Sequence, residues 1–172
     1  MLTIFTERFF LRELVPEDAN ETYLGWLNDS AIQRFITSAN KTHTQAELSA
    51  YVCSRLNRDD VLFLGIFEKQ SGKHIGNIKF EPIDTIESYA VLGMLIGDES
   101  WRGKGVAGEV IDASIDTICV QRGVKEIILG VELDNKSAIR AYEKVGFQIE
   151  PTNRISVDPS SATTMVRRKA SA

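Results

Sequence analysis

A glycine-rich segment past the middle of the 172-residue chain constrains its fold more than any other feature. The segment Trp101–Glu109 has the sequence WRGKGVAGE, with the apolar run Tyr89–Gly97 before it and the amphipathic run Val106–Gln121 after it. This order predicts a strand, a tight turn and the start of a helix. The first backbone N–H groups of a helix have no partner inside the helix, and its dipole favours negative charge there. We therefore expect residues 102–108 to cradle a pyrophosphate group.

Each residue type in this turn suits an anion. Gly103 and Gly105 allow positive φ angles and let the backbone approach a ligand closely. Arg102 and Lys104 add mobile positive charge. The residues that we expect to bind the phosphates are Arg102, Gly103, Lys104, Gly105, Val106, Ala107 and Gly108.

Hydrophobic periodicity and turn residues predict the other elements. We expect strands at 5–14, 61–68, 75–80, 89–97 and 126–131, another strand from Phe147, a final edge strand at 163–168, and helices starting near Pro16, Ala31, Thr44, Val106 and Asn135. Three consecutive strands can pair antiparallel, and one parallel crossover surrounds the glycine turn. The order predicts one domain over residues 1–172 with a mixed α/β (α+β) sheet, not a doubly wound sheet.

The turn also matches a dinucleotide-binding motif in form. Gly103–Gly108 fits G-x-G-x-x-G, and Glu132 lies not far from the acidic position that such a site needs. However, antiparallel strands are expected before the motif, and only about 60 residues follow it, too few for repeated βαβ units. A phosphate-loop kinase would need Lys after its second glycine, but Val106 follows Gly105.

Two blocks of sequence together resemble a known family. Arg102-x-x-Gly105-x-Ala107 looks like the acyl-CoA signature of the GNAT family of N-acetyltransferases. The segment 131–147 (VELDNKSAIRAYEKVGF) is similar to the second conserved block of that family, and the two blocks occur in the family's order. The segments 6–12 and 23–28 resemble the RimJ/RimL-like branch, which modifies ribosomal-protein N-termini and various small amines. The pair Trp101-Arg102 departs from the residues that this branch often has there.

The resemblance implies a fold, a co-substrate and residue roles. It implies the acyl-CoA N-acyltransferase fold: a mostly antiparallel central sheet with one parallel, splayed strand pair, flanked by helices. It implies that acetyl-CoA is the co-substrate and that Leu95 and Ile96 offer backbone groups to its pantetheine arm. Tyr142 would protonate the leaving thiolate, Asn135 would face the same side of the last helix, and Ser137 is a second possible donor.

The attacking amine must lose a proton, because a free alkyl amine is protonated near neutral pH. A carboxylate or a water chain would accept that proton. The acids expected near the cleft are Glu81, Asp84, Glu87, Asp98, Glu99 and Glu132. Among them we prefer Glu81, because it is expected to end a strand beside the strand that carries CoA.

Composition excludes several classes of protein. The net charge of −4 argues against a nucleic-acid-binding surface and suits a cationic substrate such as an amine. No apolar run reaches about 18 residues, so we expect no membrane span. Cys53 and Cys119 are far apart, and His43 and His74 lack metal-ligand spacing, so we expect no disulfide and no metal. These features favour a cytoplasmic protein, as a monomer or a homodimer.

Three functions remain open at this point. The first is an N-acetyltransferase in which a primary amine, either a protein α-amino group or an amino group of a small molecule such as an amino sugar, attacks acetyl-CoA directly in a ternary complex. The second is a non-catalytic acyl-CoA-binding module, and the third is a dinucleotide (NAD)-binding protein. The sequence does not identify the acceptor, but the loops 38–42 and 82–87 are expected to shape that choice.

Overall fold

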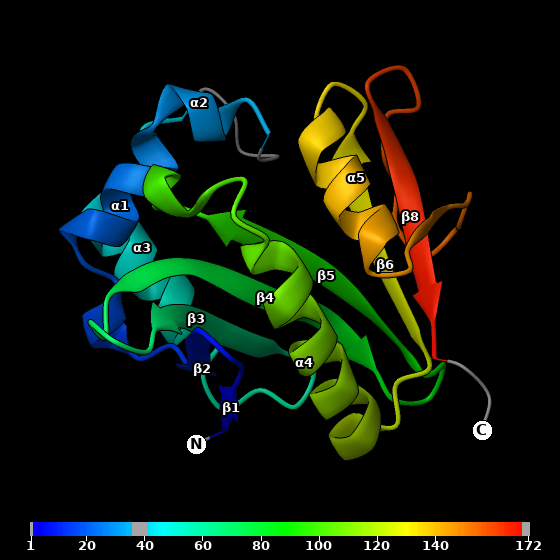
Figure 1. The fold of residues 1–172 in the computed structure, drawn as a ribbon, viewed down its shortest axis with the longest axis horizontal. Coiled ribbons are helices and arrows are strands. Elements are labelled where there is room, and N and C mark those ends of the chain that lie inside the picture. Colours follow the sequence, from blue (N-terminus) through cyan, green and yellow to red (C-terminus); the bar gives the residue numbers. More distant parts are fainter. Residues whose placement is uncertain (1, 36–40, 170–172) are drawn as a thin grey trace.

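The computed structural model describes residues 2–35 and 41–169 (Figure 1). Residues 38–40 of the loop 38–42, which we expected to help select the acceptor, lie outside these ranges. The elements in chain order are β1 (Thr3–Phe5), β2 (Phe9–Glu13), η1 (Pro16–Asp18), α1 (Glu21–Asn28), α2 (Ser30–Gln33), α3 (Gln45–Cys53), β3 (Leu62–Glu68), β4 (His74–Asp84), β5 (Tyr89–Ile96), η2 (Glu99–Trp101), α4 (Val106–Arg122), β6 (Glu126–Glu132), α5 (Lys136–Lys144), β7 (Gln148–Ile149) and β8 (Ala162–Arg168).

The described strands form an eight-stranded sheet in the order β1-β2-β3-β4-β5-β6-β8-β7. Every neighbouring pair is antiparallel except β5 and β6, which are parallel. The helix α4 makes the crossover between these two strands. This topology confirms the predicted mixed sheet with one parallel pair.

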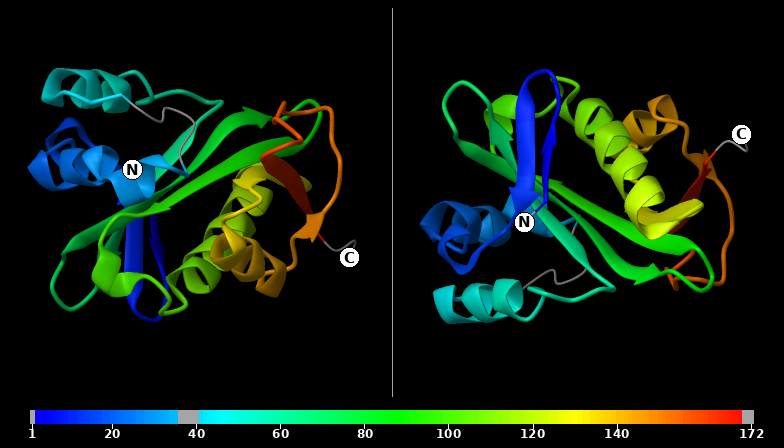
Figure 2. Two further views of the ribbon diagram at one scale, coloured as in Figure 1. Left: turned by 90° about the horizontal axis from the view of Figure 1, so that it is seen from above. Right: turned by 90° about the horizontal axis from the view of Figure 1, so that it is seen from below.

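Helices cover both faces of the sheet (Figure 2). The helices α1, α2 and α3 lie on one face, and α4 and α5 lie on the other. Alternate residues of β4 serve the two faces: Ile78 and Phe80 are fully buried in the cluster that α4 completes, whereas the side chain of Lys79 contacts Tyr51 of α3. The glycine turn therefore lies on the α4–α5 face of the sheet, and the opposite face is covered by α1, α2 and α3.

The N-terminal region differs from the sequence prediction in two places. The single strand predicted at 5–14 is a hairpin of β1 and β2, closed at Thr6, whose hydroxyl bonds the backbone of Phe9. The helix predicted from Pro16 is divided in two: the 3₁₀ turn η1 opens at Pro16 with Asp18 in its first turn, as predicted, and α1 begins at Glu21 after its cap Asn20. The carboxylate of Asp18 stays with the preceding segment. That carboxylate accepts from Val15 N at 2.8 Å and from both terminal nitrogens of Arg12.

Two strand predictions are also wrong. The strand β4 extends to Asp84 instead of ending near Phe80. The last strand β8 is not at the edge, since it lies between β6 and the two-residue strand β7. Its residues Thr164, Met165 and Val166 are all buried, as expected of a strand covered on both sides. By contrast, the predicted capping box at Thr44 and the glycine cap at Gly123 are confirmed.

Replacing Gly97 by Ala is expected to destabilise the fold, because a Cβ there would lie 1.9 Å from Cδ2 of Trp26. Overpacking of this kind typically costs about 1–3 kcal/mol of unfolding free energy, which urea denaturation would measure. Gly93→Ala is the matched control, since a Cβ at Gly93 meets nothing within 4 Å. Equal denaturation midpoints for the two variants would contradict the expected clash.

None of the helices in the described ranges is long and apolar enough to cross a membrane.

Candidate functional site

The glycine turn joins the end of β5 to the start of α4. Gly103 and Gly105 have φ angles of 71° and 73°, in the left-handed region that glycine adopts without strain. Gly105 is the N-cap of α4 and has no side chain that could satisfy the first amides of the helix. The strand, turn and helix start that the sequence predicted here are therefore confirmed.

The first turn of α4 presents unsatisfied donors. Within residues 2–35 and 41–169, the amides of Val106, Ala107 and Gly108 meet no protein acceptor, and Glu109 N bonds Gly105 O at 3.4 Å. A 17-residue helix supplies a full dipole behind these amides. Three free N–H groups at a helix N-terminus, beside two left-handed glycines, form a site for an anion.

The two cations of the turn differ in what they do. The sequence suggested that Arg102 is a mobile charge, but the structure shows it held in place. Its guanidinium donates to the carbonyls of Ile96 at 3.1 Å and Gly97 at 2.9 Å. It therefore fixes the end of β5. The Lys104 ammonium lies 5.5 Å from the ring centroid of Trp101 and stays at the turn.

Sequence analysis missed a second support of the turn, which comes from the N-terminal hairpin. Arg8 donates from Nη1 to Lys104 O at 2.9 Å and from Nε to Glu109 Oε2 at 2.7 Å. The other oxygen of Glu109 accepts from Arg8 N at 2.7 Å and from the Thr6 hydroxyl at 2.6 Å. Burial alone would raise the pKa of Glu109, but these hydrogen bonds and the Arg8 charge lower it. A lone arginine about 100 residues away carries no sequence signal for this role.

The strands β5 and β6 diverge next to the turn. They pair from Tyr89 with Glu126 to Val91 with Ile128, and no pairing follows toward their carboxyl ends. Figure 1 shows the two ribbons separating in that direction, with α4 and α5 in front of them. The predicted splayed pair is therefore present, and Leu95 and Ile96 lie on its β5 side.

The helix α5 follows β6 on the same face of the sheet as α4. Asn135 caps it, accepting from Ala138 N at 3.3 Å, and the Ser137 hydroxyl donates to Asn135 Oδ1 at 3.2 Å. The ring of Tyr142 packs edge-on against Phe147, and burial raises the pKa of its phenol to about 12. In the described contacts the Tyr142 hydroxyl has no hydrogen-bond partner, so it can donate to a ligand.

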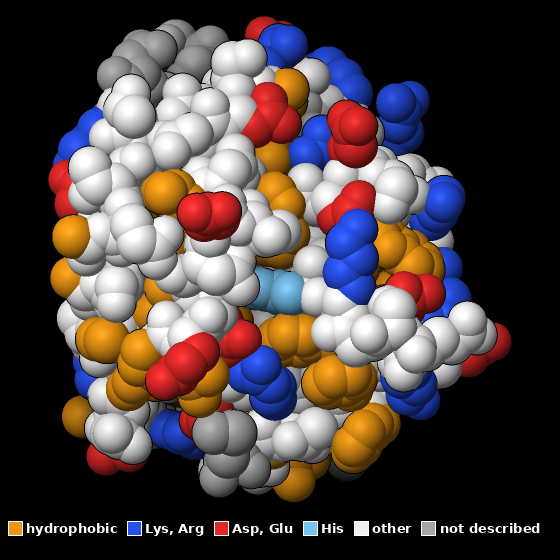
Figure 3. All heavy atoms as spheres, turned by 90° about the vertical axis from the view of Figure 1, so that its left-hand side faces the viewer, with side chains coloured by type: hydrophobic (Ala, Val, Ile, Leu, Met, Phe, Trp, Pro, Cys, Tyr) orange, Lys and Arg blue, Asp and Glu red, His pale blue; other side chains and the backbone are white. Residues whose placement is uncertain are grey.

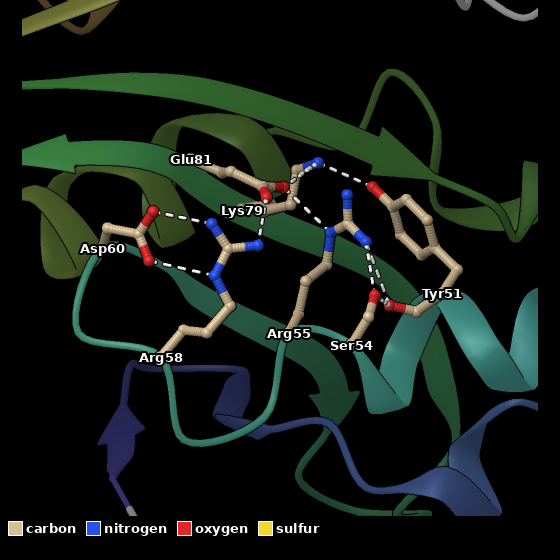
Figure 4. Close-up of polar contacts among 7 residues, drawn as sticks. All are labelled: Tyr51, Ser54, Arg55, Arg58, Asp60, Lys79 and Glu81. Carbon is tan, nitrogen blue, oxygen red and sulfur yellow. Dashed lines mark hydrogen bonds and ion pairs between the residues drawn. The ribbon is translucent and has the colours of Figure 1, made fainter.

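Glu81 lies on the other face, within a cluster of charged side chains (Figure 4). It does not end β4, contrary to the sequence expectation, since that strand continues to Asp84. Its carboxylate contacts Lys79 at 2.8 Å, Arg55 at 2.9 Å and Arg58 at 3.3 Å. Burial works to raise the pKa of Glu81, but the bonds and charges of Lys79 and Arg55 outweigh it and lower that pKa. A carboxylate stabilised in this way is a weaker proton acceptor.

The other acids considered as bases have structural partners or lie at strand ends. Asp84 accepts from two turn amides, Asp98 caps η2 and pairs with Lys73 at 2.7 Å, and Glu87 contacts Arg154.

On the face shown in Figure 3, basic and acidic side chains are interspersed without a continuous basic patch. In the described ranges no group of three or more His, Cys, Asp and Glu side chains could hold a metal ion.

Residues 8–148 match the family model of the acetyltransferase (GNAT) domain. The chain therefore belongs to the GNAT family, which argues against the dinucleotide-binding alternative.

Curated proteins match this chain over stretches of different length. The uncharacterized N-acetyltransferase p20 of Bacillus licheniformis is 28% identical over 152 residues, 87% of this chain and 84% of that protein. Mycothiol acetyltransferase of Corynebacterium aurimucosum is 41% identical over 51 residues, 30% of this chain and 16% of that protein. The match thus spans less than half the length of the first curated relatives.

Solved structures share the whole fold. The RimL ribosomal L7/L12 α-N-protein acetyltransferase in complex with coenzyme A has a TM-score of 0.83 at 17% identity, covering 97% of this chain and 98% of that chain. At this identity the likeness establishes the fold alone.

Proposed function

We propose that this protein transfers an acetyl group from acetyl-CoA to a primary amine by direct attack in a ternary complex. The observation that carries the proposal is the set of free amides at Val106, Ala107 and Gly108. They lie beside the diverging strands β5 and β6. The phenol of Tyr142, which has no partner among the described contacts, lies on the same face of the sheet. A diphosphate at the turn would leave the thioester free to extend between β5 and β6. The relative in complex with coenzyme A supports this choice of co-substrate.

In this proposal the turn residues 102–108 bind the CoA pyrophosphate. The free amides would donate to its oxygens, while Arg102 and Arg8 hold the turn in shape. Leu95 and Ile96 would pair with the pantetheine arm through their backbone groups, because β5 lacks a neighbouring strand there on its β6 side. A backbone N–H of β5 would also meet the oxyanion that forms on the attacked carbonyl.

The reaction forms a C–N bond and breaks the C–S bond of the thioester. The nitrogen loses one proton, and the leaving sulfur gains one. We assign Tyr142 to the sulfur as a hydrogen-bond donor. The pKa of the phenol, at about 12, lies well above the value of about 8.5 for a thiol, so Tyr142 does not end up ionised. The proton that the sulfur gains comes from water through the Tyr142 hydroxyl, which passes on its own proton as water supplies another. A second water takes the proton that the nitrogen loses.

The role of proton acceptor goes to water in this proposal, not to Glu81. Its carboxylate serves to hold Lys79 and Arg55 in position. Ser137, the second donor candidate, keeps its hydrogen on Asn135, so we assign both residues to capping α5. The acceptor amine must already be neutral when it attacks, so turnover should rise with pH below the amine pKa.

The acceptor is a primary amine of a small molecule or of a protein N-terminus in this proposal. The similar proteins include both kinds, a mycothiol acetyltransferase and a ribosomal L7/L12 α-N-protein acetyltransferase. We further propose a single domain that acts in the cytoplasm as a monomer or homodimer.

Thiol release from acetyl-CoA tests the proposal. A panel of primary amines should contain acceptors that release thiol well above hydrolysis, at a rate that EDTA leaves unchanged. The alternative of a non-catalytic CoA-binding module predicts binding of acetyl-CoA, measured by calorimetry, with no amine-dependent thiol release. Binding without release for every amine would refute catalysis, and EDTA inhibition would refute a metal-free reaction.

A further inference from the structure

A cluster of cations lies on the sheet face opposite the glycine turn (Figure 4). We call it the cation cluster and define it as Arg55, Arg58 and Lys79 with their acidic partners Asp60 and Glu81. The three basic side chains exceed the two acidic ones, so the cluster carries about one net positive charge. The chain as a whole has the opposite balance, with a net charge of −4.

The contacts show where the excess charge lies. Arg58 is matched by Asp60, which accepts from its Nε at 2.9 Å and its Nη2 at 2.6 Å. Arg55 and Lys79, however, share a single oxygen of Glu81, at 2.9 Å and 2.8 Å. Arg58 also approaches the other oxygen of Glu81, at 3.3 Å, but it already has both oxygens of Asp60. The positive excess therefore lies on Arg55 and Lys79, which share one oxygen.

These two cations also keep donors for a ligand. In the described contacts Nη2 of Arg55 has no acceptor, and Figure 4 shows that nitrogen without a dashed line. Lys79 donates to the Tyr51 hydroxyl at 2.6 Å, and the Arg55 guanidinium lies over the Tyr51 ring at 3.5 Å. The side chains of Arg55 and Lys79 are 18% and 24% exposed, so a ligand can reach them in surroundings where charges are only partly screened.

The cluster lies beside the opening between β5 and β6. Lys79 pairs with Gly93, two residues past Val91, where β5 and β6 stop pairing. A Cβ at Gly93 would meet nothing within 4 Å, so open space adjoins the β5 neighbour of Lys79. Because the glycine turn and Tyr142 occupy the α4–α5 face, an acceptor that meets the thioester from the other face passes this cluster.

We infer that the acceptor is a small primary amine that also carries an anionic oxygen group, a carboxylate or a phosphate, which Arg55 and Lys79 bind. This inference rests on the proposed function. A polyamine would bring further positive charge to a site that already has an excess. An anionic group would instead supply the missing acceptor for the two cations.

Amines that share one skeleton and differ in their second group test the inference. With ethanolamine as the neutral reference, β-alanine adds a carboxylate, O-phosphoethanolamine adds a phosphate, and 1,2-diaminoethane adds a cation. Glucosamine and glucosamine 6-phosphate form a larger pair. We expect kcat/KM to be at least about tenfold higher for an anionic member than for its neutral counterpart, as one charge-assisted hydrogen bond would give, and lowest for the diamine. The carboxylate and phosphate arms show which anion is preferred.

Variants of the cluster then assign the preference to its residues. Lys79→Met and Arg55→Gln should bring the anionic-to-neutral ratio of kcat/KM close to one while the affinity for CoA stays unchanged. Lys79→Arg should retain the preference. Arg58→Gln is the matched control, because Asp60 already neutralises Arg58 and its contact with Glu81, at 3.3 Å, is the longest of the three to that carboxylate. This variant should leave the ratio unchanged.

Equal or better use of the neutral or cationic amines would overturn the inference while leaving the proposed function intact. A ratio that persists in Lys79→Met and Arg55→Gln would also overturn it, because the preference would then come from elsewhere. If no amine of any charge releases thiol, the proposed function fails and the inference fails with it.

Discussion

Replacing Gly105 by Asp should abolish binding of CoA. Gly105 has a φ of 73° and precedes the free amides of α4, so a side chain there would stand against the bound phosphates. The carboxylate would also repel them. Backbone donors to a charged group contribute about 1.5–3 kcal/mol each, so losing one or two of them and adding repulsion should lower the affinity by roughly 10²–10³-fold or more. Calorimetric titration with CoA and acetyl-CoA measures this loss.

A matched control separates the ligand effect from backbone strain. Gly72 has a φ of 69°, and a Cβ there meets nothing within 4 Å, while a Cβ at Gly105 has only an ordinary contact with Arg8 Nη2 at 3.8 Å. Gly72, however, lies in the turn between β3 and β4. Gly72→Asp should therefore share the conformational cost, about 1–2 kcal/mol, and still bind CoA normally. If Gly105→Asp bound CoA as well as Gly72→Asp does, the pyrophosphate would not lie at this turn.

Replacing Tyr142 by Phe should lower kcat by about 10²-fold or more while the dissociation constant of CoA changes little. The ring packing against Phe147 survives the change. Among residues 2–35 and 41–169 the hydroxyl has no hydrogen-bond partner to lose. What disappears is the donor that meets the leaving sulfur, and positioned proton donors contribute roughly 10²–10⁴-fold to rate. Steady-state kinetics at saturating acetyl-CoA measure the effect.

The pH profile gives a second measurement on the same residue. Burial raises the pKa of Tyr142 to about 12, so the phenol stays protonated at every pH below that value. The wild-type rate should therefore show no loss from phenol ionisation between about pH 6 and 9. Tyr89→Phe, at the paired start of β5 under Arg154, is the control and should keep the wild-type kcat. An unchanged kcat in Tyr142→Phe would remove this residue from the reaction.

Several elements were predictable because their causes are local. The capping box at Thr44, the glycine cap at Gly123 and the helix start after Gly105 each depend on a few neighbouring residues. The wrong predictions arise where distant contacts decide. Asp18 is a first-turn acid as predicted, but of the short η1 and not of α1, because Arg12 and the backbone of Val15 hold its carboxylate.

The candidate site divides along the same line. The glycine turn could be found from its residue types and the α5 block from its resemblance to a family, because each lies within one short segment. Glu81 was selected because it was expected to end a strand, and that premise is wrong, since β4 continues to Asp84. Its neighbours in space, Arg55 and Arg58, come from the region after α3 and could not be predicted from its place along the chain. Arg8 was missed because its partners Lys104 and Glu109 lie about 100 residues away.

The sequence by itself determined where the chain turns and where a helix exposes free amides, because glycine conformation and helix ends depend on bonded neighbours. The tertiary structure decided which charges meet at the opening between β5 and β6. Electrostatic forces act through space, so the excess charge on Arg55 and Lys79 exists only once α3 and β4 are packed together. A chain that is acidic overall thus presents a cationic surface to its proposed acceptor.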